Sequence, residues 1–174
     1  LNELFERAGL SKQDTQVIGF GAGPGSFTGV RIAASVAQGI AMASNSKVVA
    51  MKGSEVLVRS AIEDKTLTGY SHSGEPTNWL ALIPSRADAY YVSLYQQNGA
   101  ELSVVIADQL LLEPADWVDA LAADITAQGE HILKIIGAMP SWMPKPLESY
   151  CVGTPIPDAR VMLGQVRQQY IDGT

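Results

Sequence analysis

The chain has little of what most catalytic or metal-binding chemistry requires. Its 174 residues include one cysteine, Cys151, and two histidines, His72 and His131. A lone cysteine excludes an internal disulfide and fits a reducing compartment, and Cys151 lacks the nearby histidine that would make it a nucleophile. His72 has no second histidine, cysteine or acid at metal-ligand spacing, and His131 fits the start of a strand better than a ligand, so we predict no metal site.

Positive charge is also scarce, and so are long apolar runs. The 12 lysines and arginines form no cluster, and the 18 acidic residues bring the net charge to −6. Proteins that grip nucleic acid unaided usually show a basic face, so we expect no strong direct binding to nucleic acid. No stretch approaches the length of a membrane span and no signal peptide is visible, from which we expect a cytoplasmic protein without membrane contact.

The most informative stretch is a glycine-rich turn between an apolar strand and a long helix. Apolar residues make up 47% of the chain, which is enough for a packed core. Residues 17–20 predict a buried strand, and the glycines within residues 21–25 end it. Ser26 or Thr28 is then placed to cap the helix that follows.

Small residues recur at every fourth position along this helix, at Gly29, Ala33, Ala37 and Ala41. They make one side of the helix nearly flat. Two interpretations fit this pattern. The flat side is either a surface that another helix approaches closely, or the inner side of an ordinary crossover helix buried on its own sheet.

The turn matches none of the glycine motifs that bind nucleotides or carry a nucleophile. A P-loop needs lysine before its hydroxyl residue, and here Phe27 precedes Thr28. The dinucleotide fingerprint needs a third glycine where Ser26 or Thr28 stands, and a hydrolase elbow around Ser26 needs glycines at positions 24 and 28. A tight structural turn therefore fits best. The alternative is a small-molecule enzyme or nucleotide-binding protein that uses the Gly21–Gly29 loop.

The order of elements predicts two domains. Alternating strands and helices across residues 1–62 predict parallel strands joined by crossover helices, to which a last helix at 158–172 can return. A polar break at 63–78 leads to a second, α+β domain at 78–150, which begins with a three-stranded antiparallel meander. The five prolines between residues 139 and 157 predict irregular structure there.

The ten residues Gly23 to Ile32, Gly-Pro-Gly-Ser-Phe-Thr-Gly-Val-Arg-Ile, resemble the signature of the bacterial TsaB (YeaZ) family. The likeness extends to Ala37–Ala41, to the strand at 48–50 and to Ala81–Arg86. It implies an α/β fold of the duplicated ribonuclease-H-like type, related to actin and sugar kinases. It also implies that the first strands of that fold and a closing C-terminal segment are missing from the chain.

The resemblance implies a scaffold subunit without catalysis of its own. TsaB-type proteins pair with TsaD, which carries the metal. Together with the ATPase TsaE, they transfer a threonylcarbamoyl group to the adenosine next to the anticodon of tRNAs that read ANN codons. The chain would then hold no catalytic residue, metal or cofactor, and ATP or ADP would bind only at the interface shared in the complex. Alone, the same surface would form a homodimer. An inactive glycoprotease-like homologue is a further alternative.

The resemblance also implies which residues matter. The pairing surface maps to the helices at residues 1–8 and 28–44, with contacts expected at Leu4, Phe5, Gly29, Ile32, Ala33, Val36 and Ile40. The signature loop comprises Gly23, Pro24, Gly25, Ser26, Phe27, Thr28 and Arg31. The chain departs from the family at Ala22, where a basic residue is usual, and at Pro84 and Ala89, where the family has acids. These departures weaken the case for ligand contacts there.

Overall fold

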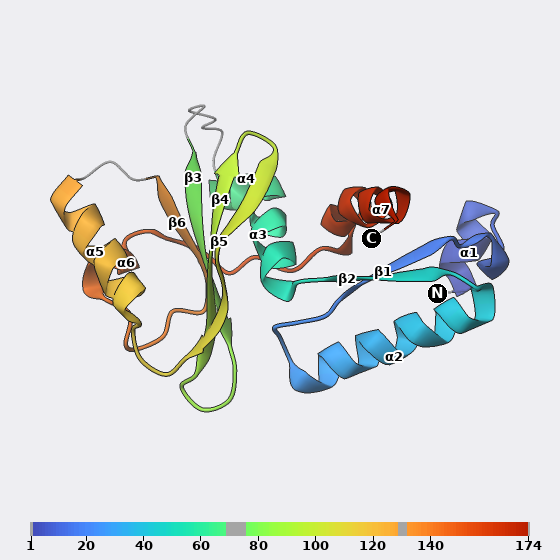
Figure 1. The fold of residues 1–174 in the computed structure, drawn as a ribbon, viewed down its shortest axis with the longest axis horizontal. Coiled ribbons are helices and arrows are strands. Elements are labelled where there is room, and N and C mark those ends of the chain that lie inside the picture. The colour runs from blue at the N-terminus through green and yellow to red at the C-terminus, as the bar shows by residue number, and fades with distance from the viewer. Residues whose placement is uncertain (1, 69–75, 129–131, 174) are drawn as a thin grey trace. The chain divides into compact units, whose positions relative to one another are not determined.

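The computed structural model describes residues 2–68, 76–128 and 132–173 (Figure 1). His72 and His131 lie outside these ranges. None of the helices in the described residues is long and apolar enough to cross a membrane.

Contacts divide the chain into two compact units. The first unit comprises residues 1–56 and 158–174, and the second comprises residues 57–157. The sequence predicted domains at residues 1–62 and 78–150, and these ranges remain predictions.

The first unit is built on a strand, helix and strand in which the two strands are parallel. Strands β1 (Val17–Gly21) and β2 (Lys47–Met51) pair in register from Val17 with Lys47 to Gly21 with Met51. Helix α2 (Phe27–Ser44) connects them. Parallel strands need such a crossover, so the strand–helix order expected from the sequence is confirmed. A short helix α1 (Asn2–Ala8) and the 3-10 turn η1 (Lys12–Asp14) precede β1.

Helix α2 begins and ends at local signals. The Ser26 hydroxyl accepts a hydrogen bond from the Gly29 N–H at 3.4 Å, so Ser26 is the cap rather than Thr28. At the other end, Asn45 adopts a left-handed conformation with φ of 54° and donates its N–H to the Ala41 carbonyl. These caps set the first turn of α2 directly after the glycine loop.

The core of the first unit lies between its sheet and helix α7 (Leu163–Asp172), which follows the 3-10 turn η2 (Ala159–Met162). A side chain on Gly19 would overlap the Cγ2 atom of Val166, so α7 packs close to β1 because that position is glycine. The buried members of this core are Val49, Met51, Val56, Met162 and Val166.

The second unit is a five-stranded mixed sheet in the order β5-β4-β3-β6-β7. The predicted antiparallel meander is confirmed by β3 (Thr77–Pro84), β4 (Tyr90–Asn98) and β5 (Glu101–Leu111). Strand β6 (Leu133–Gly137) pairs parallel with β3, and β7 (Cys151–Gly153) pairs parallel with β6.

Both faces of this sheet are covered by helices (Figure 1). Alternate residues of β3 point to opposite faces, so Leu80 and Leu82 join one core cluster while Trp79 and Ala81 join the other. The first cluster includes side chains of α5 (Asp116–Gln128) and α6 (Lys145–Glu148), and the second includes side chains of α3 (Gly53–Glu63). Cys151 is an exposed free thiol on β7.

Two segments differ from the sequence prediction. Residues 139–157 were expected to be irregular, yet they contain α6 and β7, because Pro144 is the N-cap of α6 and Pro146 lies in its first turn, where prolines are tolerated. The break at 63–78 contains the short helix α4 (Lys65–Thr68), which starts where the Asp64 carboxylate accepts the Thr66 N–H at 2.9 Å.

Candidate functional site

Some ionisable groups among the described residues have pKa values shifted by local hydrogen bonds or by burial. The pKa values of Asp14, Asp64 and Asp158 are held below their usual range because residues two or three positions away donate hydrogen bonds to each carboxylate. Burial lowers the pKa of Lys134, whose ammonium lies 5.3 Å from the centre of the Trp79 ring. Within the described ranges, no three acidic, histidine or cysteine side chains are grouped to hold a metal ion.

The signature loop is fixed by backbone contacts within the first unit. The Gly53 N–H donates to the Gly23 carbonyl at 2.6 Å, and a side chain on Gly53 would overlap the Pro24 carbonyl oxygen. Gly23 itself has φ of 92°, a conformation that favours glycine. The N–H of Ala22, the first departure from the family pattern, donates to the Met51 carbonyl at 2.8 Å. The loop therefore sets where α2 starts and in which direction it runs.

Two of the four regularly spaced small residues of α2 are buried. Ala37 and Ala41 are 3% and 8% exposed and belong to the packed part of the first unit, while Ala33 is half-buried and Gly29 is exposed. The sequence left two interpretations open for the flat side of this helix. The burial of Ala37 and Ala41 agrees with a crossover helix packed on its own sheet. The flat side lets α2 lie close to its own sheet, which α2 contacts along both strands.

The opposite side of α2 is apolar and exposed. Ile32 is 59% exposed and Val36 is 53% exposed. Gly39 and Ala43 lie on the same exposed side, because positions separated by four, three and four residues line one face of a helix. We call Ile32, Val36, Gly39 and Ala43 the outer stripe of α2. A side chain added at Gly39 would meet no atom within 4 Å, so a second helix has room to approach there.

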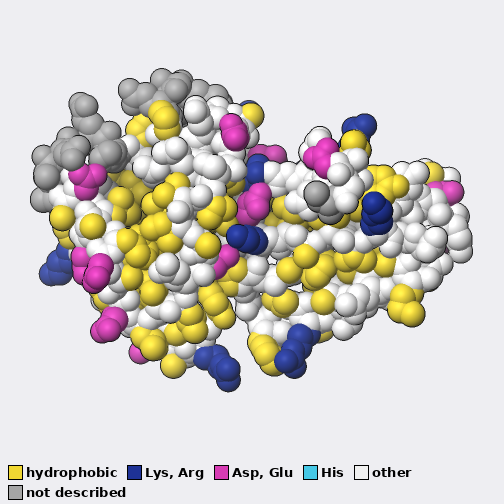
Figure 2. Space-filling model, in the orientation of Figure 1, with side chains coloured by type: hydrophobic (Ala, Val, Ile, Leu, Met, Phe, Trp, Pro, Cys, Tyr) yellow, Lys and Arg dark blue, Asp and Glu magenta, His cyan; other side chains and the backbone are white. Residues whose placement is uncertain are grey.

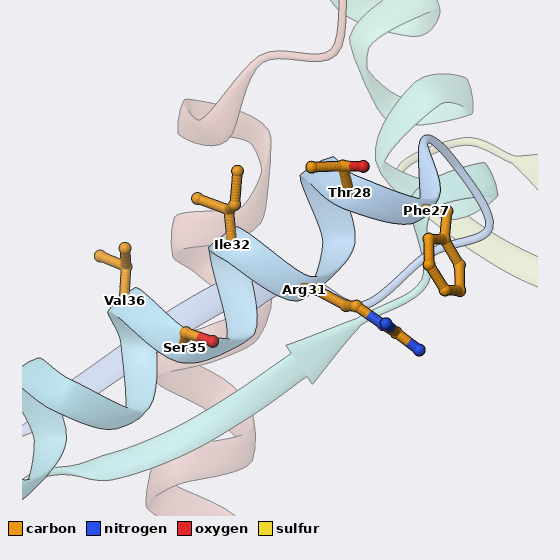
Figure 3. Close-up of a pocket in the computed structure, with 6 residues that line it drawn as sticks. All are labelled: Phe27, Thr28, Arg31, Ile32, Ser35 and Val36. Carbon is orange, nitrogen blue, oxygen red and sulfur yellow. The ribbon is translucent and has the colours of Figure 1, made fainter.

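A shallow hollow of about 360 Å³ lies at the N-terminal half of α2, lined by Phe27, Thr28, Arg31, Ile32, Ser35 and Val36. Figure 3 shows Ile32 and Val36 pointing to one side of the helix, while Phe27 and Arg31 point together to another. The Arg31 guanidinium carbon lies 3.8 Å from the centre of the Phe27 ring. Figure 2 shows a basic side chain beside a hydrophobic one where α2 begins.

The structure distributes the predicted contact residues over two helices. Leu4 and Phe5 lie on α1, which has no buried residue among its seven, and Leu4 is 66% exposed. On α2, Ile32 and Val36 are exposed and Ile40 is half-buried. Gly39 and Ala43, on the same exposed side as Ile32 and Val36, were not among the predicted contacts. Their spacing from Ile32 and Val36 is the sequence signal that places them on that side.

The family described as "TsaD: tRNA N6-adenosine threonylcarbamoyltransferase" matches residues 1–143 of this chain. Two curated relatives both carry the name "tRNA threonylcarbamoyladenosine biosynthesis protein TsaB". The Haemophilus influenzae relative is 32% identical over 93 residues, which cover 53% of this chain and 36% of the relative. The Escherichia coli relative is 29% identical over 129 residues, which cover 68% of this chain and 52% of the relative. The matched part is therefore between about a third and a half of the relatives' length.

Two solved structures from Pseudomonas aeruginosa share the fold over 99% of this chain. One is described as an uncharacterized protein with similarity to peptidase YEAZ, with a TM-score of 0.70, 25% identity and 74% of its own chain covered. The other is YeaZ, with a TM-score of 0.71, 23% identity and 75% covered, and it shows the fold alone. The expected α/β fold, ribonuclease-H-like as in YeaZ, is confirmed. By the family match, the named relatives and the shared fold, this chain belongs to the TsaD family, in its TsaB (YeaZ) branch.

Proposed function

We propose that this chain is a non-catalytic subunit in tRNA threonylcarbamoyladenosine biosynthesis and that it pairs with TsaD. The names of the two TsaB relatives support the pathway, and the family description supports a TsaD-like partner with a related fold. In this proposal TsaD performs the transfer to the adenosine next to the anticodon of ANN-decoding tRNAs. This chain supplies a surface on which TsaD docks. Both proteins are located in the cytoplasm.

One observation supports the location of the pairing surface. The outer stripe of α2 leaves two large aliphatic side chains, Ile32 and Val36, more than half exposed next to the small residues Gly39 and Ala43. Two large side chains followed by two small residues on one helix face give a ridge and a hollow against which a second helix can pack. Burying two aliphatic side chains that are already half-covered stabilises a complex by about 1–2 kcal/mol each, because full burial is worth about 1.5–3 kcal/mol.

The same surface serves two assemblies in this proposal. Helices α1 and α2 form a bundle with the corresponding helices of TsaD, and without TsaD they pair with a second copy of the chain in an isologous dimer. TsaE joins the complex as a third partner. ATP or ADP is bound where subunits meet and not by this chain alone.

The experiment compares two substitutions of exposed aliphatic residues in the first unit. Ile32→Arg places a charge in the outer stripe, and Ile171→Arg places the same charge on α7, where Ile171 is 64% exposed. Light scattering of each variant with the TsaD of the same organism measures pairing. We expect Ile32→Arg to lose the one-to-one complex and Ile171→Arg to keep it.

Two outcomes would count against the proposal. Normal pairing of Ile32→Arg would remove the outer stripe from the interface. ATP affinity of the isolated chain, abolished by Gly25→Val in the signature loop, would instead favour a nucleotide-binding protein.

A further inference from the structure

We propose that Arg31 binds a carboxylate on the docking helix of the partner. This ion pair would favour that partner over a second copy of this chain. The inference rests on the proposed function, since it concerns the same surface of α2. It begins from charge. Arg31 is the single charged residue among the 18 residues of α2.

The position of Arg31 is unfavourable for the helix taken alone. Its guanidinium lies over the ring of Phe27, the first residue of α2. A positive charge there opposes the helix dipole, whose N-terminal end is also positive. Charges that break such a local rule are expected where a residue serves a function rather than the fold. A carboxylate brought by a partner would relieve the opposition and would be attracted by both the guanidinium and the helix end.

The Phe27 ring prepares Arg31 for such a carboxylate. The Phe27 ring, 3.8 Å from the guanidinium carbon, covers one side of the group and restricts its motion, while the Arg31 side chain as a whole stays exposed. Within the described residues, Arg31 forms no ion pair that would compete; the salt bridges found there include Glu3 with Arg7 on α1. A held guanidinium loses less conformational entropy when it binds, so its edge is ready for two parallel hydrogen bonds.

The residues that line the hollow beside Arg31 indicate which kind of partner surface would fit it. Ile32 and Val36 line the same hollow as Arg31, so the partner must present an apolar helix face with Asp or Glu at its margin. A second copy of α2 has the apolar face but contains no acidic residue. On helices α1 and α2 of a second copy, the acids are Glu3 and Glu6 of α1, and Glu3 already pairs with Arg7 at 3.2 Å. Charge complementarity therefore favours the heterologous partner.

The test measures the dissociation constant for TsaD and for the homodimer in parallel. Arg31→Glu reverses the charge, Arg31→Gln removes it, and Arg167→Glu reverses an exposed charge on α7 as the matched control. We expect Arg31→Glu to weaken pairing with TsaD by about ten- to hundredfold, the range for a lost charged hydrogen bond, and to change the homodimer far less. Replacing the facing acid of TsaD by lysine should restore the complex of Arg31→Glu. The salt dependence of wild-type pairing should flatten in Arg31→Gln.

The outcomes separate this inference from the proposed function. If Ile32→Arg abolishes pairing while Arg31→Glu binds TsaD as tightly as the wild type, the stripe is the interface and the role of Arg31 is refuted. Equal weakening of homodimer and heterodimer by Arg31→Glu would refute selection of the partner. If Ile32→Arg pairs normally, the proposed function fails first. Circular dichroism melts of each variant establish that it is folded, and Arg31→Gln repeats the comparison without introducing a new charge.

Discussion

Ala37 and Ile32 lie on opposite sides of α2, so the same substitution at each should separate folding from pairing. Ala37 is 3% exposed against the chain's own sheet, and arginine there must bury a charge without a partner or push the helix away. Either event costs several kcal/mol, against a total stability of about 5–15 kcal/mol for a protein of this kind. Ala37→Arg should therefore unfold the first unit or destabilise it severely.

Ile32→Arg should behave in the opposite way. Ile32 is 59% exposed, and substitutions at such surface positions usually change stability by less than about 0.5 kcal/mol. Pairing should still be lost, because the complex loses about 1–2 kcal/mol of apolar burial and gains a charge inside the interface. Urea unfolding measures the first quantity and light scattering with TsaD measures the second. A wild-type midpoint for Ala37→Arg, or a drop of more than about 2 kcal/mol for Ile32→Arg, would refute the assignment of the two faces.

Three further substitutions test other parts of the structure. Asp158 accepts a side-chain hydrogen bond from Arg160, which lowers the pKa of Asp158 in the folded state. The stabilisation of the folded state by this carboxylate is therefore present above the unfolded pKa near 3.8 and is lost as the pH falls through the folded pKa. The melting temperatures of wild type and Asp158→Asn should thus differ at pH 7 and converge in acid. Gly19→Ala should destabilise by about 1–3 kcal/mol through overlap with Val166, and Val166→Ala in the same chain should recover part of the loss in urea melts. Ser93→Ala should leave stability unchanged or raise it, because the Ser93 hydroxyl is fully buried and has no hydrogen-bond partner in the described structure.

Local signals in the sequence were sufficient for the strand, loop and helix at the start of the chain. An apolar run, a cluster of glycines and a capping serine occur in order, and each acts within a few residues of itself. The segment at 139–157 was misjudged because prolines were counted without regard to position. Pro144 and Pro146 occupy a cap and a first turn, where a missing N–H costs nothing.

The orientation of α2 could not be read from its sequence. Both sides of the helix carry apolar residues, so periodicity alone does not say which side packs on the sheet. The small residues drew attention because their spacing is regular, yet Ala37 and Ala41 are buried within the chain. Ile32 and Val36 were named as contacts from the family resemblance, and only the burial of each side chain separates the inner face from the outer.

The glycine loop before α2 lies outside the outer stripe, and its geometry explains how it affects that surface. Gly23 accepts a hydrogen bond from Gly53, whose lack of a side chain admits the Pro24 carbonyl, and this contact fixes the loop before α2. The first residue of the helix follows at Phe27, so any change of the loop would rotate or shift the turn that carries Phe27 and Arg31. A rotation of one residue moves a helix face by 100°, which would turn Ile32 and Val36 away from a partner. We therefore interpret the signature as the device that orients the docking helix, with recognition left to side chains further along α2.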